Sequence, residues 1–558
     1  MRQSSAVSLT DASPWHRIIP GSKRRLLSAV IVIALFSFST FFIGLGTPAL
    51  WDRDETIYAL AAREMQERNE WLVPTIEGKP FLEKPILIYW LARTSYAAFG
   101  VDEFSSRLPS AVFGLLTCLT IFFMARPLWG GEAAVFSAIV FSTSLLPAVV
   151  FRLFLPDPAL TFFSTLALAF YLRSTATAGK AGRFLLLAYS AMALGFLSKG
   201  PIALFPAAIF LMHSWLTRKR ALPALRYLWL VGLTLVLAAP WFAYALYTQE
   251  ESMAKFFLFE NLHRFASVIE GHRGNAMYYV PVLLLGVFPW SFFLIFALVS
   301  EWKSLGERLR HDPAVSLFLL WIVIPFAALS LSATKLPHYL LIVFPALACL
   351  AGKFLHEAGS RGRSSLNAPL VATASFTVLI VQLLVVAHFA APRYAPAAAL
   401  YPFCLLSVLL LIAVVFALRG RARHAAFLSC AGAALFCAGL FAMSLPWVES
   451  LRVMRPIALA AKSAAEHGGE VYRFGVSEPS LSFYSGRYIP SVNEERLDDI
   501  LRRRVPTYVV VNESKLKKAA PRAAYKIIAK KEGFAESRGP MTLLLIGNGR
   551  DEPPQTSP

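Results

Sequence analysis

The segment LLSAVIVIALFSFSTFFIGL, residues 26–45, carries no charged side chain and is long enough to cross a membrane as one helix. It is too long for the apolar part of a signal peptide, it lacks a small-residue cleavage site, and many further apolar runs follow it. Of the 558 residues, 56% are hydrophobic and only 16% are charged, which excludes an ordinary soluble domain. The sequence therefore predicts a polytopic α-helical membrane protein.

Further apolar segments are long enough to cross the hydrocarbon, which takes about 20 residues per helix. With the first span they lie at residues 26–46, 106–125, 132–150, 157–172, 183–198, 201–216, 226–247, 279–299, 314–332, 338–355, 368–388, 397–418 and 424–443. The sequence Lys199-Gly200-Pro201 is either a tight turn between two helices or a break within one. We expect about thirteen transmembrane helices.

Lysine and arginine gather in alternate short loops, which indicates the cytoplasmic side. The basic loops are residues 21–25, 173–183, 217–226, 301–310, 360–363 and 419–423, whereas opposite loops carry single basic residues such as Lys199, Lys335 and Arg393. With an odd number of spans, the chain after residue 443 lies outside the cytoplasm. The net charge of +20 is partly this loop signal, and we expect no nucleic-acid partner.

The chain divides into a transmembrane domain, residues 1–443, and a C-terminal domain, residues 444–558. The C-terminal part alternates short strand patterns at 470–476, 506–512 and 541–547 with helix patterns at 455–467 and 496–503. We expect a small extracytoplasmic α/β domain. The last ten residues, 549–558, are polar and proline-rich, which predicts disorder.

The first loop outside the cytoplasm, residues 47–105, begins with the acidic stretch WDRDETIYALAAREM, residues 51–65. Residues 54–71 have the pattern of an amphipathic helix, with Ile57, Leu60, Ala61 and Met65 on one face. Residues 84–100 form a second such segment, rich in the Trp and Tyr that favour the headgroup region. Both patterns predict helices lying in the membrane interface.

Asp54 and Glu55 have two interpretations. Acidic residues at a helix start can serve as caps alone. However, ionisable residues also occupy the membrane edge of the other outside loops, where they are costly and tend to mark a site. These are Glu83, Lys84, Arg152, Asp157, Lys199, His263, Arg264, His272, Arg273, Lys335 and His338. The second interpretation predicts a cavity at the outer membrane surface that binds anionic ligands.

Five motifs in order resemble the bacterial GT-C glycosyltransferases related to protein O-mannosyltransferases. They are DETIYALAAREM (54–65), GKPFLEKPILIYWLARTSYAAFGVDEFSSRLPS (78–110), FLSKGPIALFP (196–206), NAMYYVPVLLLGVFPWSFF (275–293) and SATKLPHYLLIVFPALACL (332–350). Within that superfamily the chain is most similar to the transferases that attach 4-amino-4-deoxy-L-arabinose to lipid A. It departs from the family pattern at Ile86 and Ile342, where proline is common.

The resemblance implies transfer of a sugar from undecaprenyl phosphate to an acceptor outside the inner membrane. The family's acidic motif falls on Asp54 and Glu55, and its second outside acid falls on Asp157. If the acceptor is a lipid A phosphate, its oxygen is already ionised near neutral pH and no general base is needed. If the acceptor is a protein hydroxyl, a carboxylate such as that of Asp54 becomes the base.

The departing lipid phosphate requires cations, since negative charge grows on it during transfer. The candidates are Lys84, Arg264, Lys199 and Lys335. The alternative for each is that it extends to lipid headgroups. Tyr58, Tyr339 and His338 are candidate sugar or lipid contacts, although tyrosines at this depth are also common without such a role.

The sequence assigns no cofactor, but it leaves open a site for a divalent metal such as zinc, magnesium or manganese. Glu83 and His263 are the preferred ligand pair, with His272 and His338 also outside. No pair has the i, i+4 spacing of helical metal ligands, and hydrogen-bonded scaffolding is the alternative.

The sequence thus predicts a multi-pass enzyme of the bacterial inner membrane whose active site faces the periplasm. Aminoarabinose and lipid A are the favoured sugar and acceptor, which implies resistance to polymyxin and cationic antimicrobial peptides. A protein O-mannosyltransferase or another polyprenyl-phosphate-hexose transferase is the alternative. A transporter would place its charges near the membrane midplane, whereas here they gather in outside loops.

Overall fold

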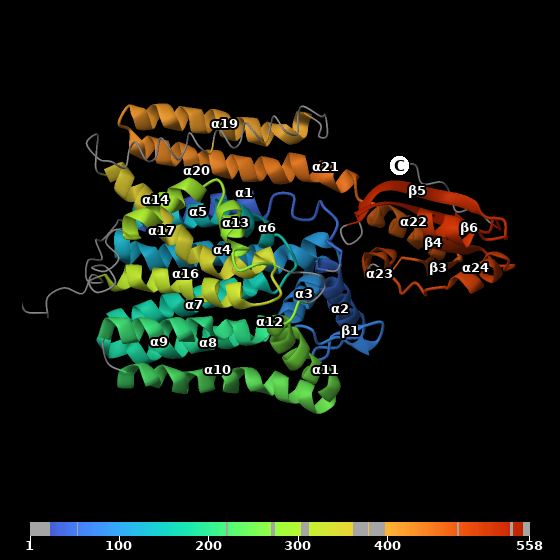
Figure 1. Ribbon diagram of the computed structural model, residues 1–558, viewed down its shortest axis with the longest axis horizontal. Coiled ribbons are helices and arrows are strands. Elements are labelled where there is room, and N and C mark those ends of the chain that lie inside the picture. Colours follow the sequence, from blue (N-terminus) through green and yellow to red (C-terminus); the bar gives the residue numbers. More distant parts are fainter. Residues whose placement is uncertain are drawn as a thin grey trace, which may run out of the picture.

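Long helices lie side by side along most of the molecule, and the last part of the chain forms a separate mixed domain at one end (Figure 1). The computed structural model describes residues 23–550 except 53, 219–220, 269–273, 303–311, 477–478, 536–538 and 361–396, with 378 and 385 described within that last range. Eight helices in the described part are long and apolar enough to cross a membrane. The protein is therefore a multi-pass membrane protein, and the total of thirteen spans stays a prediction.

The predicted spans coincide with helices, apart from 368–388, of which only residues 378 and 385 are described. The helices of this part are α1 (Lys23–Phe41), α4 (Glu103–Trp129), α5 (Gly131–Thr143), α6 (Leu145–Val150), α7 (Asp157–Ala176), α8 (Ala181–Lys199), α9 (Phe205–Arg218), α10 (Ala221–Thr248), α13 (Tyr279–Gly286), α14 (Ser291–Trp302), α16 (Pro313–Leu331), α17 (Phe344–Ser360), α19 (Ala397–Leu418), α20 (Ala422–Gly439) and α21 (Leu445–Ser450). The predicted spans 132–150 and 279–299 are each divided between two helices.

Short helical segments connect these long ones, chiefly at the end that carries the C-terminal domain. They are η2 (Ala178–Lys180), η3 (Gly200–Leu204), α11 (Glu250–Lys255), η4 (Phe256–His263), α12 (Arg264–Ala266), η5 (Pro337–Val343) and η6 (Leu440–Ser444). The segment η4 is a π-helix, a widened form that is often found at functional sites.

The Lys199-Gly200-Pro201 sequence forms a turn between two antiparallel helices. Gly200 has a φ of +76°, a conformation that favours glycine. The ring centroids of Tyr189 in α8 and Phe210 in α9 lie 5.8 Å apart, at similar distances along the chain from the turn. The turn places Lys199 at the tip of a helical hairpin.

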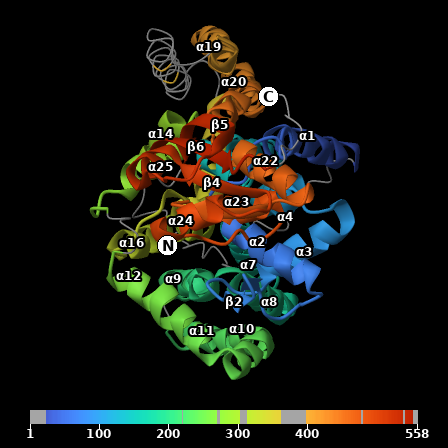
Figure 2. The same ribbon diagram turned by 90° about the vertical axis from the view of Figure 1, so that its right-hand side faces the viewer.

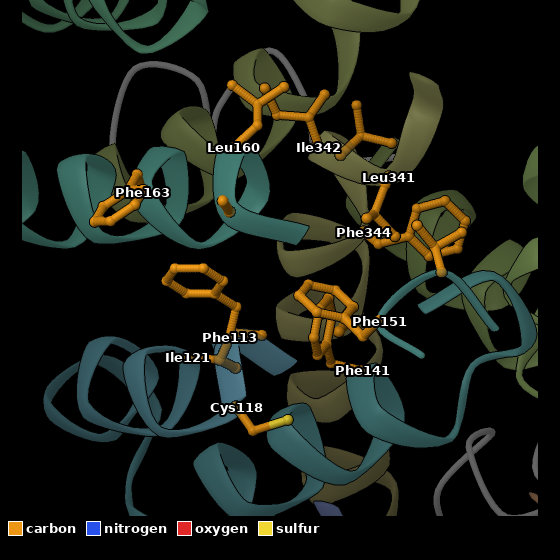
Figure 3. Packing of buried hydrophobic residues seen from close by; sticks show 14 of the residues in the cluster. Phe113, Cys118, Ile121, Phe141, Phe151, Leu160, Phe163, Leu341, Ile342 and Phe344 are labelled. Atoms are coloured by element: carbon orange, nitrogen blue, oxygen red, sulfur yellow. The ribbon is translucent and has the colours of Figure 1, made fainter. Parts of the chain in front are cut away.

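Aromatic and aliphatic side chains fill the interior of the bundle (Figure 3). Phe113 of α4 contacts Phe163 of α7, with ring centroids 5.5 Å apart. Phe141 of α5 contacts Phe151 at 5.6 Å, at the end of α6. Such edge-to-face contacts between helices hold the bundle beyond the gain from burial alone.

The loop 47–105 contains α2 (Glu55–Glu67), the hairpin of β1 (Thr75–Ile76) and β2 (Lys79–Pro80), and α3 (Leu87–Phe99). Both predicted amphipathic segments are thus helical. In α2, Leu60, Ala61 and Met65 of the predicted apolar face are buried inside the protein, where α2 packs against α3 and the C-terminal domain. The apolar face of α2 is therefore covered by protein, which differs from the expected contact with lipid.

The C-terminal domain is a four-stranded sheet in the order β3 (Glu470–Phe474), β4 (Thr507–Asn512), β6 (Gly539–Gly547) and β5 (Lys526–Ala535). The first pair is parallel and the other two pairs are antiparallel. The helices α22 (Met454–Glu466) and α23 (Pro479–Ser485) contribute to one core, and α24 (Glu494–Leu501) and α25 (Glu513–Ala519) to another. A small α/β domain is confirmed, while the boundary at residue 443 stays a prediction.

The C-terminal domain and the 47–105 loop lie together when the molecule is viewed end-on (Figure 2). Two hydrogen bonds run from the Arg63 guanidinium to the carbonyls of Phe483 and Gly486, at 3.0 and 2.6 Å. The Tyr484 hydroxyl accepts from the Leu50 amide at 2.7 Å. The last domain of the chain therefore holds the first outside loop in place.

Candidate functional site

A cavity of about 610 Å³ lies between the segment before α3, the α8–α9 turn, η4 and η5. Its charged lining residues are Glu83, Lys84, Lys199, Glu260 and Arg264. Its apolar lining includes Ile202, Phe205, Phe256, Phe257, Phe265 and Leu329. The cavity therefore combines three cations with an apolar wall, a combination that suits an amphiphilic anion.

The Glu260 carboxylate holds two of these cations together. Its Oε2 atom lies 3.1 Å from Lys84 Nζ and 3.1 Å from Arg264 Nε. Glu260 and Arg264 come from η4 and its continuation into α12, whereas Lys84 comes from the outside loop. One largely buried carboxylate thus fixes two cations from distant parts of the chain at the cavity surface.

Glu83 adds a second carboxyl group beside this cluster. Burial raises the pKa of Glu83 above its usual value, and the negative charge of Glu260 raises it further. The neighbouring Lys84 opposes this shift. The net direction is upward, so Glu83 keeps its proton to a higher pH than an exposed glutamate would.

A second ion pair lies at the hairpin tip. Asp157, at the start of α7, is buried, and its Oδ1 accepts a hydrogen bond from Lys199 Nζ at 2.5 Å. His338 Nε2 lies 3.9 Å from the other carboxylate oxygen of Asp157. Lys199 also lies 4.4 Å from the ring centroid of Tyr339, which lines the cavity. Asp157 and His338 therefore stand behind Lys199 and Tyr339 and are not cavity-lining residues themselves.

Tyr58 in α2 links the acidic motif to the cavity residues. Lys84 Nζ lies 6.0 Å from the centroid of its ring. Burial raises the pKa of the Tyr58 phenol, and the negative charges of Glu83, Glu260 and Asp54 raise it further. The charges of Asp54 and of the two cavity carboxyl groups thus all act on this one phenol.

Asp54 occupies the capping position of α2 but makes no capping hydrogen bond through its side chain, which is exposed. A capping hydrogen bond therefore does not account for this carboxylate, although its charge still lies at the favourable end of the helix dipole. The geometry leaves the prediction of a role in catalysis open for Asp54.

Glu55 is fully buried and is paired with Arg107 at 2.6 Å. Its carboxylate also accepts hydrogen bonds from the amides of Trp51 and Phe154, at 2.9 and 2.7 Å. Arg107 donates to three carbonyls in the segment 45–49 as well. Both oxygens of Glu55 are thus engaged by protein, and this geometry favours a positioning role over the predicted direct catalytic role.

Two predicted cations are used within the fold. Lys335 is buried, and its Nζ donates to three main-chain carbonyls at the end of α16. Arg152 donates to the Thr40 carbonyl and lies 4.0 Å from the ring centroid of Phe441. Neither residue is among those that line the cavity, so the structure does not bring Lys335 to the expected phosphate site.

The predicted metal pair is divided between two environments. Glu83 lines the cavity, whereas His263 is exposed and its ring stacks on Phe259 with centroids 5.1 Å apart. Within the described ranges no group of three or more His, Cys, Asp or Glu side chains could hold a metal ion. Two donors alone do not make a protein metal site. His272 and Arg273 lie outside the described residues.

Sequence reasoning missed two members of these clusters, Glu260 and Arg107. Glu260 interrupts the aromatic run FFLFENLH, residues 256–263, and an acidic residue within such a run is itself a signal of function. Arg107 lies inside one of the quoted motifs, but only the folded structure shows that it pairs with Glu55.

A protein-family model and several curated proteins match this chain. The family model described as dolichyl-phosphate-mannose-protein mannosyltransferase matches residues 83–244. Undecaprenyl phosphate-alpha-4-amino-4-deoxy-L-arabinose arabinosyl transferases are similar over about 340 residues. The protein from Yersinia enterocolitica is 29% identical, over 60% of each chain, and that from Pectobacterium carotovorum is 33% identical, over 59% of each chain. The chain thus spans about 60% of the length of the curated relatives it matches.

Solved structures show the same fold over nearly the whole chain. The crystal structure of ArnT from Cupriavidus metallidurans bound to undecaprenyl phosphate has a TM-score of 0.76, covering 96% of this chain and 100% of that one at 20% identity. The apo structure of the same protein has a TM-score of 0.75. The expected resemblance is confirmed: the chain has the GT-C fold of ArnT and is similar in sequence to the aminoarabinose transferases.

Proposed function

We propose that the protein transfers a sugar, 4-amino-4-deoxy-L-arabinose, from undecaprenyl phosphate to a phosphate group of lipid A. The observation that carries this proposal is the cavity in which Lys84, Lys199 and Arg264 face an apolar wall. A polyprenyl phosphate needs both features, since it has an anionic head and a hydrocarbon tail. The relatives named as arabinosyl transferases support the choice of donor and sugar.

In this proposal, the cavity cations stabilise the leaving group. The acceptor phosphate oxygen forms a bond to the anomeric carbon as the bond from that carbon to the lipid phosphate oxygen breaks. The bonding electrons depart with undecaprenyl phosphate, whose charge becomes more negative. Lys84 and Arg264 then interact more strongly with the product phosphate than with the donor, which lowers the barrier.

Asp54 has the role of orienting the donor. An acceptor phosphate is already ionised near neutral pH, because the second pKa of a phosphate monoester is about 6, and no base has to remove a proton. The sugar carries an amino group that is a cation at this pH. We propose that the exposed Asp54 carboxylate binds this ammonium and so sets the position of the anomeric carbon.

The reaction site lies at the periplasmic face of the inner membrane in this proposal. The alternation of basic loops supports this orientation, since it assigns the opposite end of the bundle to the cytoplasm. Transfer of an amino sugar adds a positive charge to lipid A. The resulting loss of net negative charge would weaken the binding of polymyxin and other cationic peptides.

The test is expression in a Gram-negative host that makes the lipid-linked sugar but lacks its own transferase. We expect the mass spectrum of lipid A to show a pentosamine adduct. The adduct should disappear with Asp54→Asn at equal protein level. The exposed Asp499→Asn, in the C-terminal domain, serves as the matched control and should retain the adduct.

Unmodified lipid A from a well-expressed protein would overturn lipid A as the acceptor. The match to a family of protein mannosyltransferases names the second candidate function. Glycosylated periplasmic proteins would then be the expected products, and Asp54 would act as the general base that removes the hydroxyl proton.

A further inference from the structure

A second large cleft lies at the end of the bundle opposite the candidate site. Its volume is about 850 Å³, and it is formed by the first turns of α1, α5 and α20 and the last turns of α4 and α7. Four arginines line it, Arg25, Arg126, Arg173 and Arg423. Glu132 is the one carboxylate among the lining residues, and it pairs with Arg423 at 2.9 Å. The cleft therefore carries a net positive charge.

The cleft continues into an apolar groove. A second cavity of about 250 Å³ runs between α4 and α7 and shares Phe123 and Arg173 with the cleft. Its other lining residues are apolar side chains such as Leu119 and Leu166, together with Thr120. The Thr120 hydroxyl donates to the Leu116 carbonyl at 2.8 Å, so it offers the groove no unsatisfied donor. A cationic cleft that opens into an apolar groove matches an amphiphile with an anionic head.

Neither loop charge nor helix polarity explains this arrangement fully. The positive-inside rule accounts for basic residues at this end. The helix dipole accounts for Arg126 and Arg173, which lie in the last turns of α4 and α7. Neither effect requires a cleft of this size or its continuity with an apolar groove.

We infer that this cleft binds an anionic glycerophospholipid, with the headgroup phosphate at the arginines and one acyl chain in the groove between α4 and α7. Guanidinium groups form paired, charge-assisted hydrogen bonds with phosphate oxygens. Basic pockets between helices on the cytoplasmic side are suited to anionic headgroups. The site shares no residue with the cavity of the proposed reaction, so the two can be tested separately.

The experiment is native mass spectrometry of the full-length protein in detergent with added phosphatidylglycerol, and with phosphatidylcholine of the same acyl chains. We expect preferential binding of phosphatidylglycerol. The double variant Arg126→Gln/Arg173→Gln should weaken that binding roughly tenfold, as expected for the loss of charged hydrogen bonds. Arg419→Gln/Arg421→Gln, which removes two arginines at the same end but outside the cleft, should leave it unchanged.

Arg423→Gln is the variant with the lowest risk to folding, because 61% of its side chain is exposed. It should weaken phosphatidylglycerol binding by a smaller factor. Ala169→Phe, which fills the groove, should weaken binding of the two-chain lipid while leaving binding of inorganic phosphate unaltered. If Ala169→Phe leaves the binding of phosphatidylglycerol unaltered as well, no acyl chain occupies the groove and the site is one for free anions. An equal loss of lipid binding in the cleft and control variants would show that the lipid binds only to the general surface of the protein. Either result overturns the inference.

Discussion

Two clusters of opposite charges, Glu55 with Arg107 and Glu260 with Lys84 and Arg264, differ in what surrounds them. Glu55 and Arg107 are both fully enclosed, and Glu55 accepts two further main-chain hydrogen bonds. Glu260 also binds cations, but Lys84 and Arg264 are partly exposed and line a cavity of about 610 Å³. The first cluster is closed to any ligand, whereas the second has cations at a surface that a ligand can reach.

The first cluster therefore supports the fold, whereas the second can bind a ligand. A buried charge whose partners are all protein atoms is costly to disturb and gains nothing from a ligand. Two cations that share one carboxylate are held in place without being fully neutralised. They can therefore still bind an anionic phosphate. Substitutions in the two clusters should for this reason have different effects on stability and on activity.

The largest effect is expected from Arg107→Ala. The change leaves the Glu55 carboxylate buried without its cation and removes donors to three carbonyls. Breaking a buried pair in this way costs about 3–5 kcal/mol. We expect a marked fall in the thermal unfolding midpoint of the purified protein. Arg68→Ala, at the exposed end of α2, is the control, and an equal midpoint for both variants would contradict a scaffolding role.

Lys84→Gln and Arg264→Gln should each leave the unfolding midpoint nearly unchanged but reduce sugar transfer. Removal of one group that stabilises developing charge lowers turnover by about 10²–10³. The measurement is the rate of adduct formation with a fixed amount of lipid-linked donor. Lys255→Gln, a nearby cation outside this cavity, is the control. Full activity in both cavity variants would remove them from the proposed leaving-group site.

Glu260→Gln should strengthen ligand binding, in contrast to the two cation variants. Because the change removes the negative charge that Lys84 and Arg264 share, both cations become more available to the ligand phosphate. We expect the Kd for undecaprenyl phosphate to fall roughly tenfold, the size of one charged hydrogen bond. Product release should slow in parallel. Weaker binding would mean that Glu260 is needed chiefly to position the two cations.

The smallest effect concerns pH and Glu83. Its raised pKa means that the folded protein favours the protonated carboxyl group. The associated stability is fully present below the unfolded pKa and is lost as pH rises through the folded pKa. Ligand affinity should likewise fall as pH rises, since ionisation of Glu83 adds a negative charge beside the cations.

The comparison of wild type with Glu83→Gln isolates this effect, because the ligand phosphate titrates equally in both. As pH rises, the Kd of the wild type for undecaprenyl phosphate should increase relative to the Kd of Glu83→Gln. The variant should therefore bind this ligand more tightly at high pH. A ratio that stays constant between pH 4 and pH 8 would remove Glu83 as the titrating group.

The membrane helices could be predicted from sequence because apolar composition alone determines them. The strands β3 and β4 were also expected, since both are short apolar segments near turn residues. The strand β5 was missed because its sequence KIIAKKEGFA carries charges of the kind that protect an edge strand. Its pairing with β6 depends on the folded sheet.

The candidate site was predictable in kind but not in arrangement. Costly charges beside hydrocarbon identified Lys84, Lys199 and Arg264, which the cavity does bring together. No pattern in the sequence distinguishes these from Lys335, whose partners are carbonyls of its own segment. That distinction depends on where the backbone turns after α16, which apolar periodicity does not encode.

The contacts between the C-terminal domain and the first outside loop also set an order of events during biosynthesis. Leu50 leaves the ribosome 434 residues before Tyr484, its hydrogen-bond partner. At 5–20 residues per second, this separation corresponds to roughly 20–90 seconds of translation. The loop that carries the acidic motif therefore waits for the end of the polypeptide before its supports are complete. A chain released too early would enter the membrane without a finished site.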